Sequence, residues 1–382
     1  MAAEASEHAF LTRSADVLLK SDAGLDELYE LKGELQSGAQ AGCTTAVDRR
    51  TGLPYALTVY ALDDLGRDKC EELAAAVAAQ RRIADAPADL GGEELSSARL
   101  SLVREVLLSP TRLILVSELA PSGASAAAAP AEAPSSGRGG GGPYLCDDLL
   151  SVLQRRGRLA ESDARRIFAR LVLATKRAHD CGAVLRSIKP EVVQVVQAQK
   201  NGAFEVWLSQ LHAAAPVPAG EEGTEAQTLT GLHGTPEYCA PEVTIWYWFE
   251  CTPPRLPEPP PPYGAKADVW ALGMCLHVML CGCFPFQTSL PEEDLLRTIN
   301  TADFAFNDPG WRKVSEEALD LVGQMLQRDP LDRPVLEEVL QHAFCADALQ
   351  EVMAAEAALS STMDEKSFDA ALAALDSGDD DE

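Results

Sequence analysis

The sequence predicts an α+β fold in which strands come first and helices follow. Short runs of β-branched and aromatic residues, bounded by turn residues, occupy 29–60 and 100–119. After residue 144, apolar residues recur at helical spacing. Between the two parts lies 121–143, which consists mainly of Ala, Gly, Ser and Pro and predicts a flexible insertion. The chain therefore reads as a strand-rich part and a helix-rich part joined by a linker.

The expected elements follow in chain order. Near 17–19 we expect a short helix or no fixed structure. We then expect strands at 29–35, 43–47 and 55–60, an alanine-rich helix at 70–83, and a hairpin of strands at 100–106 and 113–119. Helices are expected to start at 147 and 161, followed by a strand at 204–209, helices at 268–283, 295–306 and 314–326, and amphipathic helices in 346–375.

Composition excludes several classes of partner. The 382 residues carry a formal net charge of −27, with a pI near 4.6, which argues against nucleic acid and anionic membranes as partners. The 10 cysteines show no pairing pattern, and Cys281-x-Cys283 lacks a second pair at zinc spacing. Reduced thiols and the absence of a secretory signal in the first ten residues predict an intracellular, cytoplasmic protein. The longest apolar stretch, 271–286, is too short for a membrane span and predicts a buried helix.

Three sequence blocks follow one another in the second half of the chain. Residues 234–242 read G-T-P-E-Y-C-A-P-E, 266–273 read K-A-D-V-W-A-L-G, and 280–286 read L-C-G-C-F-P-F. Together they resemble the end of the activation segment and the central helix of eukaryotic protein kinases, with the A-P-E signature at Ala240, Pro241 and Glu242. The pattern from 280 to 306 most resembles the calcium/calmodulin-dependent group of serine/threonine kinases.

This resemblance covers about 29–344 and implies a bilobal kinase-like fold, with a small antiparallel β-sheet lobe and a larger, mostly α-helical lobe. It divides the chain into a 1–28 extension, an N-lobe at 29–120, the 121–143 insertion, a C-lobe at 144–345 that contains an aromatic and Pro-rich insertion at 244–262, and a helical segment with an acidic tail at 346–382.

The motifs that bind nucleotide in kinases are degraded. In the window of the glycine-rich loop, 36–43, Gly38 alone falls on a family glycine, and glycines are needed there for the backbone to approach phosphates. The family's V-A-I-K lysine, which pairs with the α/β-phosphates, corresponds to Thr58. The helix at 70–83 has no acidic residue from 73 onward that would pair with such a lysine.

The catalytic and metal-binding positions have also changed. The catalytic-loop base corresponds to Ser187, the loop's metal-binding Asn to Val192, and the D-F-G Asp to Gln210. By contrast, the family's packing residues at these two motifs correspond to Leu185 and Leu211, which remain apolar. Positions that carry charge or metal are therefore lost, whereas packing positions persist.

Other family positions are retained. Lys189 is kept, either as a phosphate contact or, in our reading, as a structural group. Thr228 and Thr230 lie where activation segments are phosphorylated, and Arg186 is the family's phosphate-pairing arginine. Four residues are predicted to have structural roles: Arg186, Glu242, Asp268 and Arg333, with Glu242 and Arg333 as a buried pair.

We interpret the chain as a pseudokinase that binds or scaffolds protein partners through 244–262 and 346–375, without a required cofactor. One alternative is an atypical ATP-dependent kinase with a substitute lysine at Lys32 or Lys189 and a metal site built from Gln210 or from Asp147 and Asp148. Another is a nucleotide-sensing pseudokinase, in which ATP contacts the residual hinge. The candidate residues for this nucleotide contact are Glu118, Leu119, Ala120, Gly38 and Lys189.

Overall fold

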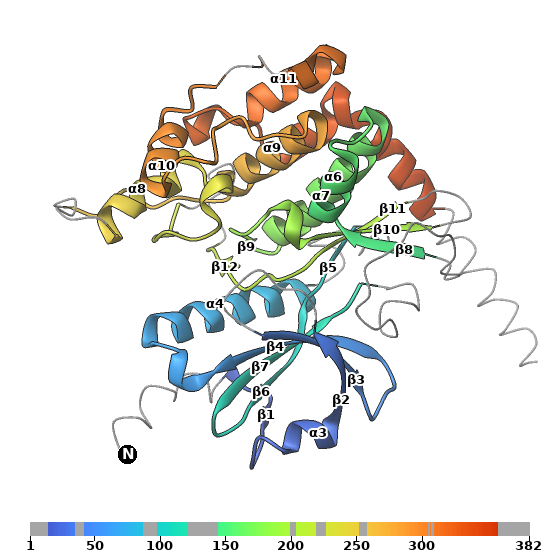
Figure 1. Cartoon of the computed structure of the whole chain (residues 1–382), viewed down its shortest axis with the longest axis vertical. Coiled ribbons are helices and arrows are strands. Elements are labelled where there is room, and N and C mark those ends of the chain that lie inside the picture. The colour runs from blue at the N-terminus through green and yellow to red at the C-terminus, as the bar shows by residue number, and fades with distance from the viewer. Residues whose placement is uncertain are drawn as a thin grey trace, which may run out of the picture.

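The computed structural model describes residues 14–34, 42–86, 98–120, 144–198, 204–218, 227–251, 258–304, 306 and 309–357. The chain forms a smaller lobe built on a curled sheet and a larger lobe built mainly of helices (Figure 1). The predicted bilobal α+β fold is confirmed. Gly38 and the 121–143 insertion lie outside the described residues.

The small lobe contains a six-stranded sheet with the order β1-β6-β7-β4-β3-β2. Its strands are β1 (Val17–Leu18), β2 (Tyr29–Glu34), β3 (Gly42–Asp48), β4 (Pro54–Ala61), β6 (Val103–Leu108) and β7 (Arg112–Glu118). All neighbours are antiparallel except β1 and β6. The three strands predicted between residues 29 and 60 are confirmed as β2, β3 and β4, which pair antiparallel in sequence order.

The N-terminal segment differs from the prediction, because residues 17–18 form a strand and α3 (Gly24–Leu28) follows. Two apolar residues are too few to predict a strand, but the free edge of β6 pairs with them in parallel register, Val17 opposite Leu107. Asp16 strengthens this pairing by accepting from the backbone of Val106 at 2.7 Å and from Arg81 at 2.6 Å. The segment is thereby tied to both the sheet and the helix above it.

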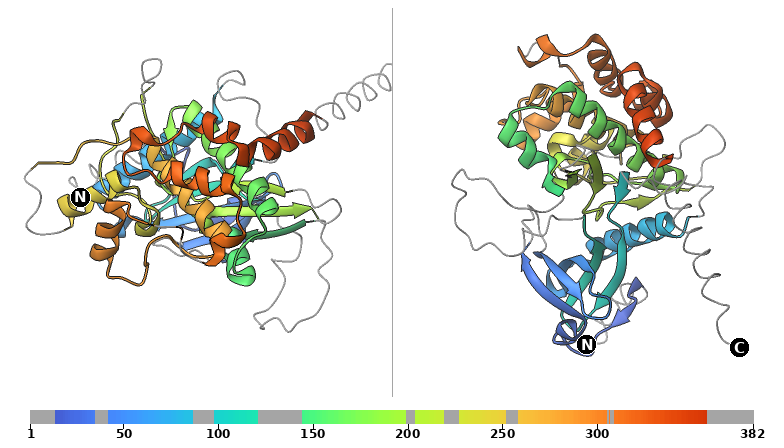
Figure 2. Two further views of the ribbon diagram at one scale, coloured as in Figure 1. Left: turned by 90° about the horizontal axis from the view of Figure 1, so that it is seen from above. Right: turned by 90° about the vertical axis from the view of Figure 1, so that its right-hand side faces the viewer.

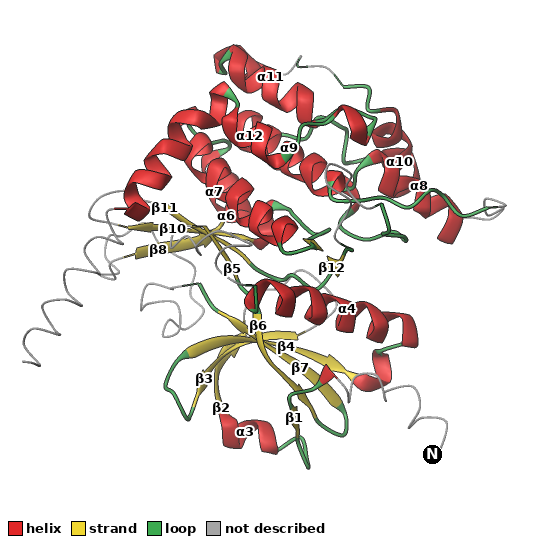
Figure 3. Ribbon diagram, turned by 180° about the vertical axis from the view of Figure 1, so that it is seen from behind, coloured by secondary structure: helices red, strands yellow, loops and turns green. Residues whose placement is uncertain are grey.

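The predicted alanine-rich helix is α4 (Arg67–Ala84), which lies between the sheet and the large lobe (Figures 1 and 3). Its buried side includes Ala74, Ala76 and Ala79, whose small side chains allow close approach on either side. On the large-lobe side, α4 contacts β9 (Ala183–Val184) and β12 (Ala215–Pro216). The helix thus connects the two lobes.

One predicted strand is wrong. The stretch 100–106 is divided between β5 (Ala98–Leu100) and β6, and the two strands belong to different sheets. β5 pairs in parallel with β11 (Phe204–Leu208) in a four-stranded sheet whose order is β5-β11-β10-β8. The buried residues Leu100, Leu102 and Val103 cross this change of sheet without an intervening Gly or Pro, so the sequence gives no sign of it. The remaining strands of this sheet are β8 (Tyr144–Asp148) and β10 (Val193–Ala198).

The large lobe is built on helices. They are α6 (Leu149–Arg156), α7 (Glu161–Asp180), α8 (Pro241–Glu250), α9 (Lys266–Cys281), α10 (Glu292–Thr301), α11 (Glu316–Met325) and α12 (Leu336–Gln341), with short 3-10 turns at η2 (Pro190–Val192), η3 (Pro236–Tyr238), η4 (Pro309–Lys313) and η5 (Pro330–Asp332). Residues 147–148 end a strand instead of beginning a helix, and Asp148 caps α6 by accepting from Ser151. Residues 343–357 form a further helix, which projects outward from the large lobe in the left view of Figure 2.

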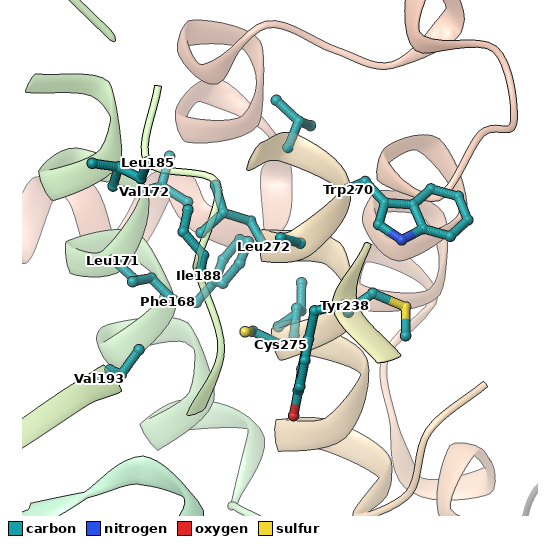
Figure 4. Close-up of a cluster of buried hydrophobic side chains, with 14 of the residues drawn as sticks. Phe168, Leu171, Val172, Leu185, Ile188, Val193, Tyr238, Trp270, Leu272 and Cys275 are labelled. Carbon is teal, nitrogen blue, oxygen red and sulfur yellow. The ribbon is translucent and has the colours of Figure 1, made fainter. Parts of the chain in front are cut away.

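The core of the large lobe surrounds α9, whose residues from Ala267 to Cys281 are all buried. Because every side of this helix is buried, its apolar residues are not confined to one face. Gly273 allows this packing, since a Cβ there would lie 2.9 Å from Met325 and Leu326. Figure 4 shows Leu185 and Ile188 beside side chains of α7 and α9.

The aromatic insertion begins inside α8, which continues directly from the A-P-E motif. Pro241 at the first helical position favours this start. Trp246 is buried, whereas Ile245, Tyr247, Trp248 and Phe249 are half-buried. None of the helices in the described part of the chain combines the length and apolarity needed to cross a bilayer.

Candidate active-site cleft

Thr58 lies on β4 with its side chain buried in the sheet. It is 6% exposed, and its hydroxyl lies 3.9 Å from the sulfur of Cys43 on the neighbouring strand β3. Lys32, the suggested substitute for a lysine at this position, is on β2, where its ammonium group pairs with Glu30 at the surface. Among the described contacts, Thr58 has a neutral partner, and Lys32 pairs with Glu30 instead.

The loop after β9 contains Ser187 at the position of the catalytic base. Asp268 of α9 holds this loop: its carboxylate accepts from the backbone N–H groups of Leu185 at 2.7 Å and Arg186 at 2.8 Å, and lies 2.8 Å from Nε2 of His179. Ser187 itself donates to the carbonyl of Leu185 at 3.2 Å. A hydroxyl bonded in this way is no base near neutral pH.

The two metal positions lie side by side. Ser209, immediately before Gln210, donates to the carbonyl of Val192 through its backbone N–H at 2.9 Å and its hydroxyl at 3.0 Å. Val192 is 1% exposed, so its apolar side chain faces the core. Gln210 is half-buried and offers an amide oxygen, which Mg²⁺ accepts less readily than a carboxylate.

Nearby carboxylates have other partners. Asp147 pairs with Arg155 at 2.6 Å, and Asp148 accepts from both the backbone and the hydroxyl of Ser151. Across the described ranges, no group of three or more His, Cys, Asp or Glu side chains is arranged to hold a metal ion.

The backbone at both motifs keeps a constrained conformation. Arg186 and Gln210 have φ angles of +57° and +55°, in the left-handed region that costs an ordinary residue about 1–2 kcal/mol. Between these motifs, the apolar replacements Leu185 and Leu211 are 0% and 2% exposed and belong to the main core. Packing therefore holds the backbone of both motifs in this conformation.

Lys189 and Thr235 connect the catalytic loop to the activation segment. The ammonium group of Lys189 donates to the Thr235 hydroxyl at 2.8 Å. Arg186 donates through Nε to the carbonyl of Ala213 at 2.6 Å. Both cations line one recess, together with Ser187, His233, Gly234 and Thr235.

The A-P-E glutamate makes a bidentate ion pair with the end of the large lobe. Arg333 donates to both carboxylate oxygens of Glu242 at 2.7 Å, and its side chain is fully buried. It also donates to the carbonyls of Gln327 and Lys266. This fork anchors the activation segment to the large lobe without any contribution from a substrate or nucleotide.

Comparison with known proteins agrees with this geometry. The family model described as the protein kinase domain matches residues 143–345. This chain belongs to the protein kinase domain family. A MAP kinase-interacting serine/threonine-protein kinase, mnk-1, of Caenorhabditis elegans is 32% identical over 53% of this chain and 30% of its own length. The Arabidopsis thaliana serine/threonine-protein kinase PEPKR2 is 33% identical over 53% of this chain and 37% of its own. This chain thus spans less than two fifths of the length of these two relatives.

A relative from the calcium/calmodulin-dependent group matches over more of this kinase-family chain. The calcium/calmodulin-dependent protein kinase type 1B of Rattus norvegicus is 26% identical over 86% of this chain and 78% of its own length. The resemblance to that group of serine/threonine kinases is therefore confirmed.

In kinases, the activation segment and hinge carry further candidate residues. Thr228 and Thr230 are exposed and flank Leu229, which makes an isolated bridge with Tyr263. The described contacts do not join either threonine to Arg186. At the hinge, Glu118 lies 3.8 Å from Arg104. Leu119 is half-buried, and the buried Ala120 packs with Val196 and Trp207.

Gln80 is a site residue that the sequence interpretation missed. It is 1% exposed on α4, donates to the carbonyl of Leu211 at 3.0 Å, and accepts from the backbone N–H of Val103 at 2.9 Å. One side chain thus joins α4, β6 and the segment after Gln210. A single amide within an alanine-rich apolar face is the signal that would have indicated it, because buried polar groups require partners.

Glu72 makes a second contact from α4 to the activation segment. Its carboxylate lies 2.9 Å from the ammonium group of Lys69 and 3.6 Å from Nδ1 of His233. Burial raises the pKa of Glu72, but the hydrogen bonds and charges of His233 and Lys69 outweigh burial and lower the pKa to about 2. The carboxylate therefore stays ionised at any physiological pH.

His212 follows Leu211 and packs edge-on against Tyr60, with ring centroids 6.1 Å apart. Its Nδ1 is shielded from solvent and has no hydrogen-bond partner among the described residues. Burial lowers the pKa of His212 to about 4, and the positive charge of Lys69 adds to this effect. The ring is therefore neutral in the folded protein near pH 7.

Proposed function

We propose that this protein is a pseudokinase: a kinase-family protein that binds and scaffolds protein partners without transferring phosphate. One observation carries the proposal. The cleft has the backbone geometry of a kinase, but four positions that would carry charge or metal hold Thr58, Ser187, Val192 and Gln210. Phosphoryl transfer depends on positioning and charge stabilisation, so a cleft without these groups has little to offer the transition state.

The contacts of the substitute groups support this proposal over an atypical kinase. Lys32 and Lys189 have partners outside the Thr58 environment, at Glu30 and Thr235 respectively. The groups of a catalytic centre act as a unit, so a single displaced lysine would not restore the activity lost with the base and both metal ligands.

The retained parts suit a binding role. Arg333 and Glu242 hold the activation segment, and Asp268 holds the catalytic loop, each through several hydrogen bonds. Half-buried aromatics of α8 and the helix at 343–357 provide surface for a protein partner. Tyr and Trp are enriched at such interfaces because they combine apolar area with a polar group.

The test is a phosphotransfer assay with radiolabelled ATP, Mg²⁺ and a general serine/threonine kinase substrate. We expect no incorporation above a sample that lacks the protein. Ser187→Val removes the loop hydroxyl and serves as the control for contaminating kinases. Incorporation by the native chain that disappears in Ser187→Val or Lys189→Met would overturn the proposal in favour of an atypical kinase.

A further inference from the structure

Two cysteines that the proposed function does not use lie next to each other at the end of α9. Cys281 is the last residue of this helix, and Cys283 follows two positions later. The thiol of Cys283 donates to the sulfur of Cys281, and the two sulfur atoms are 3.5 Å apart. The S–S bond of a disulfide is about 2.0 Å long, so an approach of about 1.5 Å would bring these sulfurs to bonding distance.

The backbone between the two cysteines makes a tight turn. Gly282 has a φ of 82° and a ψ of 4°, in the left-handed region, and its N–H donates to the carbonyl of Val278 at 2.8 Å. Two extended residues span up to about 7 Å, whereas disulfides join Cα atoms that are about 4.4–6.8 Å apart. The turn therefore shortens the span toward the range of disulfides. A Cβ at Gly282 would collide with the carbonyl oxygen of Gly157, so the turn packs closely against this residue.

Cys283 is also held in place from α9. Its carbonyl accepts from Nδ1 of His277 at 2.9 Å. The His277 side chain is buried, and its ring packs edge-on against Trp311 with ring centroids 4.8 Å apart. Because this backbone is already ordered beside the end of α9, closing a bond between the two thiols costs little additional conformational entropy.

The two thiols differ in accessibility, which gives them different roles in an oxidation. Cys283 is half-buried, whereas Cys281 is 8% exposed. Cys281 also ends a helix, whose C-terminus has a partial negative charge that opposes the formation of a thiolate. A reagent from solvent therefore reacts first with Cys283.

We propose that Cys281 and Cys283 form a reversible redox modification site, which a small-molecule disulfide such as oxidised glutathione converts into an intrachain disulfide. The Cys283 thiolate attacks one sulfur of the small disulfide, forms a mixed disulfide and releases one thiolate. The Cys281 thiolate then attacks the Cys283 sulfur and releases the second thiolate. The two protein thiols are oxidised, the small disulfide is reduced to two thiols, and the two protons of the protein thiols pass to them. Excess small thiol reverses both steps.

The residue after Cys283 connects this site to the activation segment. Phe284 packs edge-on against Tyr238, with ring centroids 5.2 Å apart. Tyr238 belongs to η3, at the end of the activation segment, and is buried. Drawing Cys283 toward Cys281 displaces the adjoining Phe284, so we expect oxidation to weaken the contact between Phe284 and Tyr238.

The test is oxidation of the full chain in buffers of reduced and oxidised glutathione, followed by acid quenching, alkylation of the remaining thiols and peptide mass spectrometry. The tryptic peptide 267–297 contains both cysteines and Cys275. We expect this peptide to lose two hydrogen atoms, with Cys275 alkylated. When total glutathione is raised about tenfold at a fixed ratio of its two forms, the ratio of disulfide to dithiol should fall about tenfold, because two glutathione thiols are released.

Two outcomes of this titration would overturn the proposal. One is a glutathione adduct on Cys283 without the intrachain bond, whose ratio to the unmodified thiol would not change with total glutathione at a fixed ratio of its forms. The other is the absence of oxidation at 281–283 in the most oxidising buffer.

Single variants separate the roles of the two thiols. Cys281→Ser removes the second thiol, so the glutathione adduct on Cys283 should accumulate. Cys283→Ser removes the accessible thiol, and Cys281 should then stay reduced. Cys251→Ser changes an exposed cysteine at the end of α8 and should leave the oxidation of 281–283 unchanged. An adduct on Cys281 in the Cys283→Ser chain, or none on Cys283 in the Cys281→Ser chain, would contradict the assigned order of attack.

Amide hydrogen exchange tests the effect on the activation segment. The N–H groups of Tyr238 and Cys239 donate to the carbonyls of Thr235 and Pro236. Loss of one aromatic contact should make these amides exchange about three to ten times faster in the oxidised chain. The Cys283→Ser chain in the same buffers should show no change. Equal exchange in the reduced and oxidised native chain would refute this effect. None of these measurements depends on phosphate transfer, so their outcome is independent of the proposed function.

Discussion

Two sets of positions in this chain differ in charge. One set aligns with the nucleotide- and metal-binding motifs of kinases, and the other holds the activation segment in place. Thr58, Val192 and Gln210, which the kinase resemblance aligns with nucleotide- and metal-binding positions, carry no charge. Around the activation segment, Lys189 donates to the hydroxyl of Thr235, and Arg333 donates two hydrogen bonds of 2.7 Å to Glu242. The contacts that shape the activation segment are independent of the groups that perform chemistry. A kinase-family chain can therefore lose its catalytic groups and still keep the contacts that hold the activation segment in place.

The largest expected effect on stability concerns the ion pair that anchors the activation segment to the large lobe. Arg333→Leu leaves the Glu242 carboxylate without its partner, and losing one member of a buried pair costs about 3–5 kcal/mol. We expect urea denaturation to show this loss in the free energy of unfolding. The control is Arg312→Leu, an exposed arginine of the same lobe, which should cost less than about 0.5 kcal/mol. Similar costs for both would mean that the anchor is not structural.

The next effect concerns the connection between the lobes. Gln80→Met keeps the side-chain size but leaves the Leu211 carbonyl and the Val103 N–H unpaired, at a cost of about 1–3 kcal/mol. Thermal unfolding measures it, with Ala78→Met on the exposed side of α4 as the matched control. An effect no larger than that of the control would show that Gln80 does not join α4 to the cleft.

A smaller effect depends on pH. The pKa of His212 is lowered to about 4 in the folded state from an unfolded value of 6.5, so the unfolded state binds the proton first as pH falls. Stability should therefore be complete above pH 6.5 and should decline between pH 6.5 and 4, by about 1 kcal/mol at pH 5 after allowing for partial exposure. His212→Phe should remove this part of the decline in urea titrations at pH 7 and pH 5. An unchanged pH profile in the variant would contradict the assignment.

The smallest effect concerns the helix at 343–357. Glu351 pairs with Arg166 at 2.9 Å, but the two side chains are 53% and 43% exposed, so Glu351→Gln should cost less than about 1 kcal/mol. Val352 is fully buried beside it, so Val352→Ala should cost more, about 1–3 kcal/mol. Chemical denaturation of both variants checks the order, and a larger cost for the ion-pair variant would reverse our account of how this helix is held.

The sequence predicted the parts of the fold that repeat a regular pattern. The strands β2 to β4 and the helices α4, α7 and α9 were expected within a few residues of their observed ends. The change of sheet between β5 and β6 was not expected, because no Gly or Pro separates the two strands. The β1 strand was also missed, since its pairing depends on a sheet edge supplied by distant residues.

The candidate site likewise has parts that the sequence predicted and parts that it did not. The resemblance to kinase motifs pointed to Ser187 and Gln210, and in the structure they follow β9 and β11, with positive φ at Arg186 and Gln210. Spacing did not indicate that Glu72 would reach His233 or that Gln80 would bridge two elements. Such contacts depend on how α4 sits against the large lobe, which no local pattern encodes.

The most direct test of the central claim is calorimetric titration of the full chain with ATP, in the presence and absence of Mg²⁺. The claim is that the cleft keeps a kinase shape but has lost its metal-binding and catalytic groups. We predict that Mg²⁺ does not change the measured affinity, because Val192 and Gln210 provide no carboxylate for the ion. An affinity that rises about tenfold or more when Mg²⁺ is added would reveal a working metal site and contradict the account.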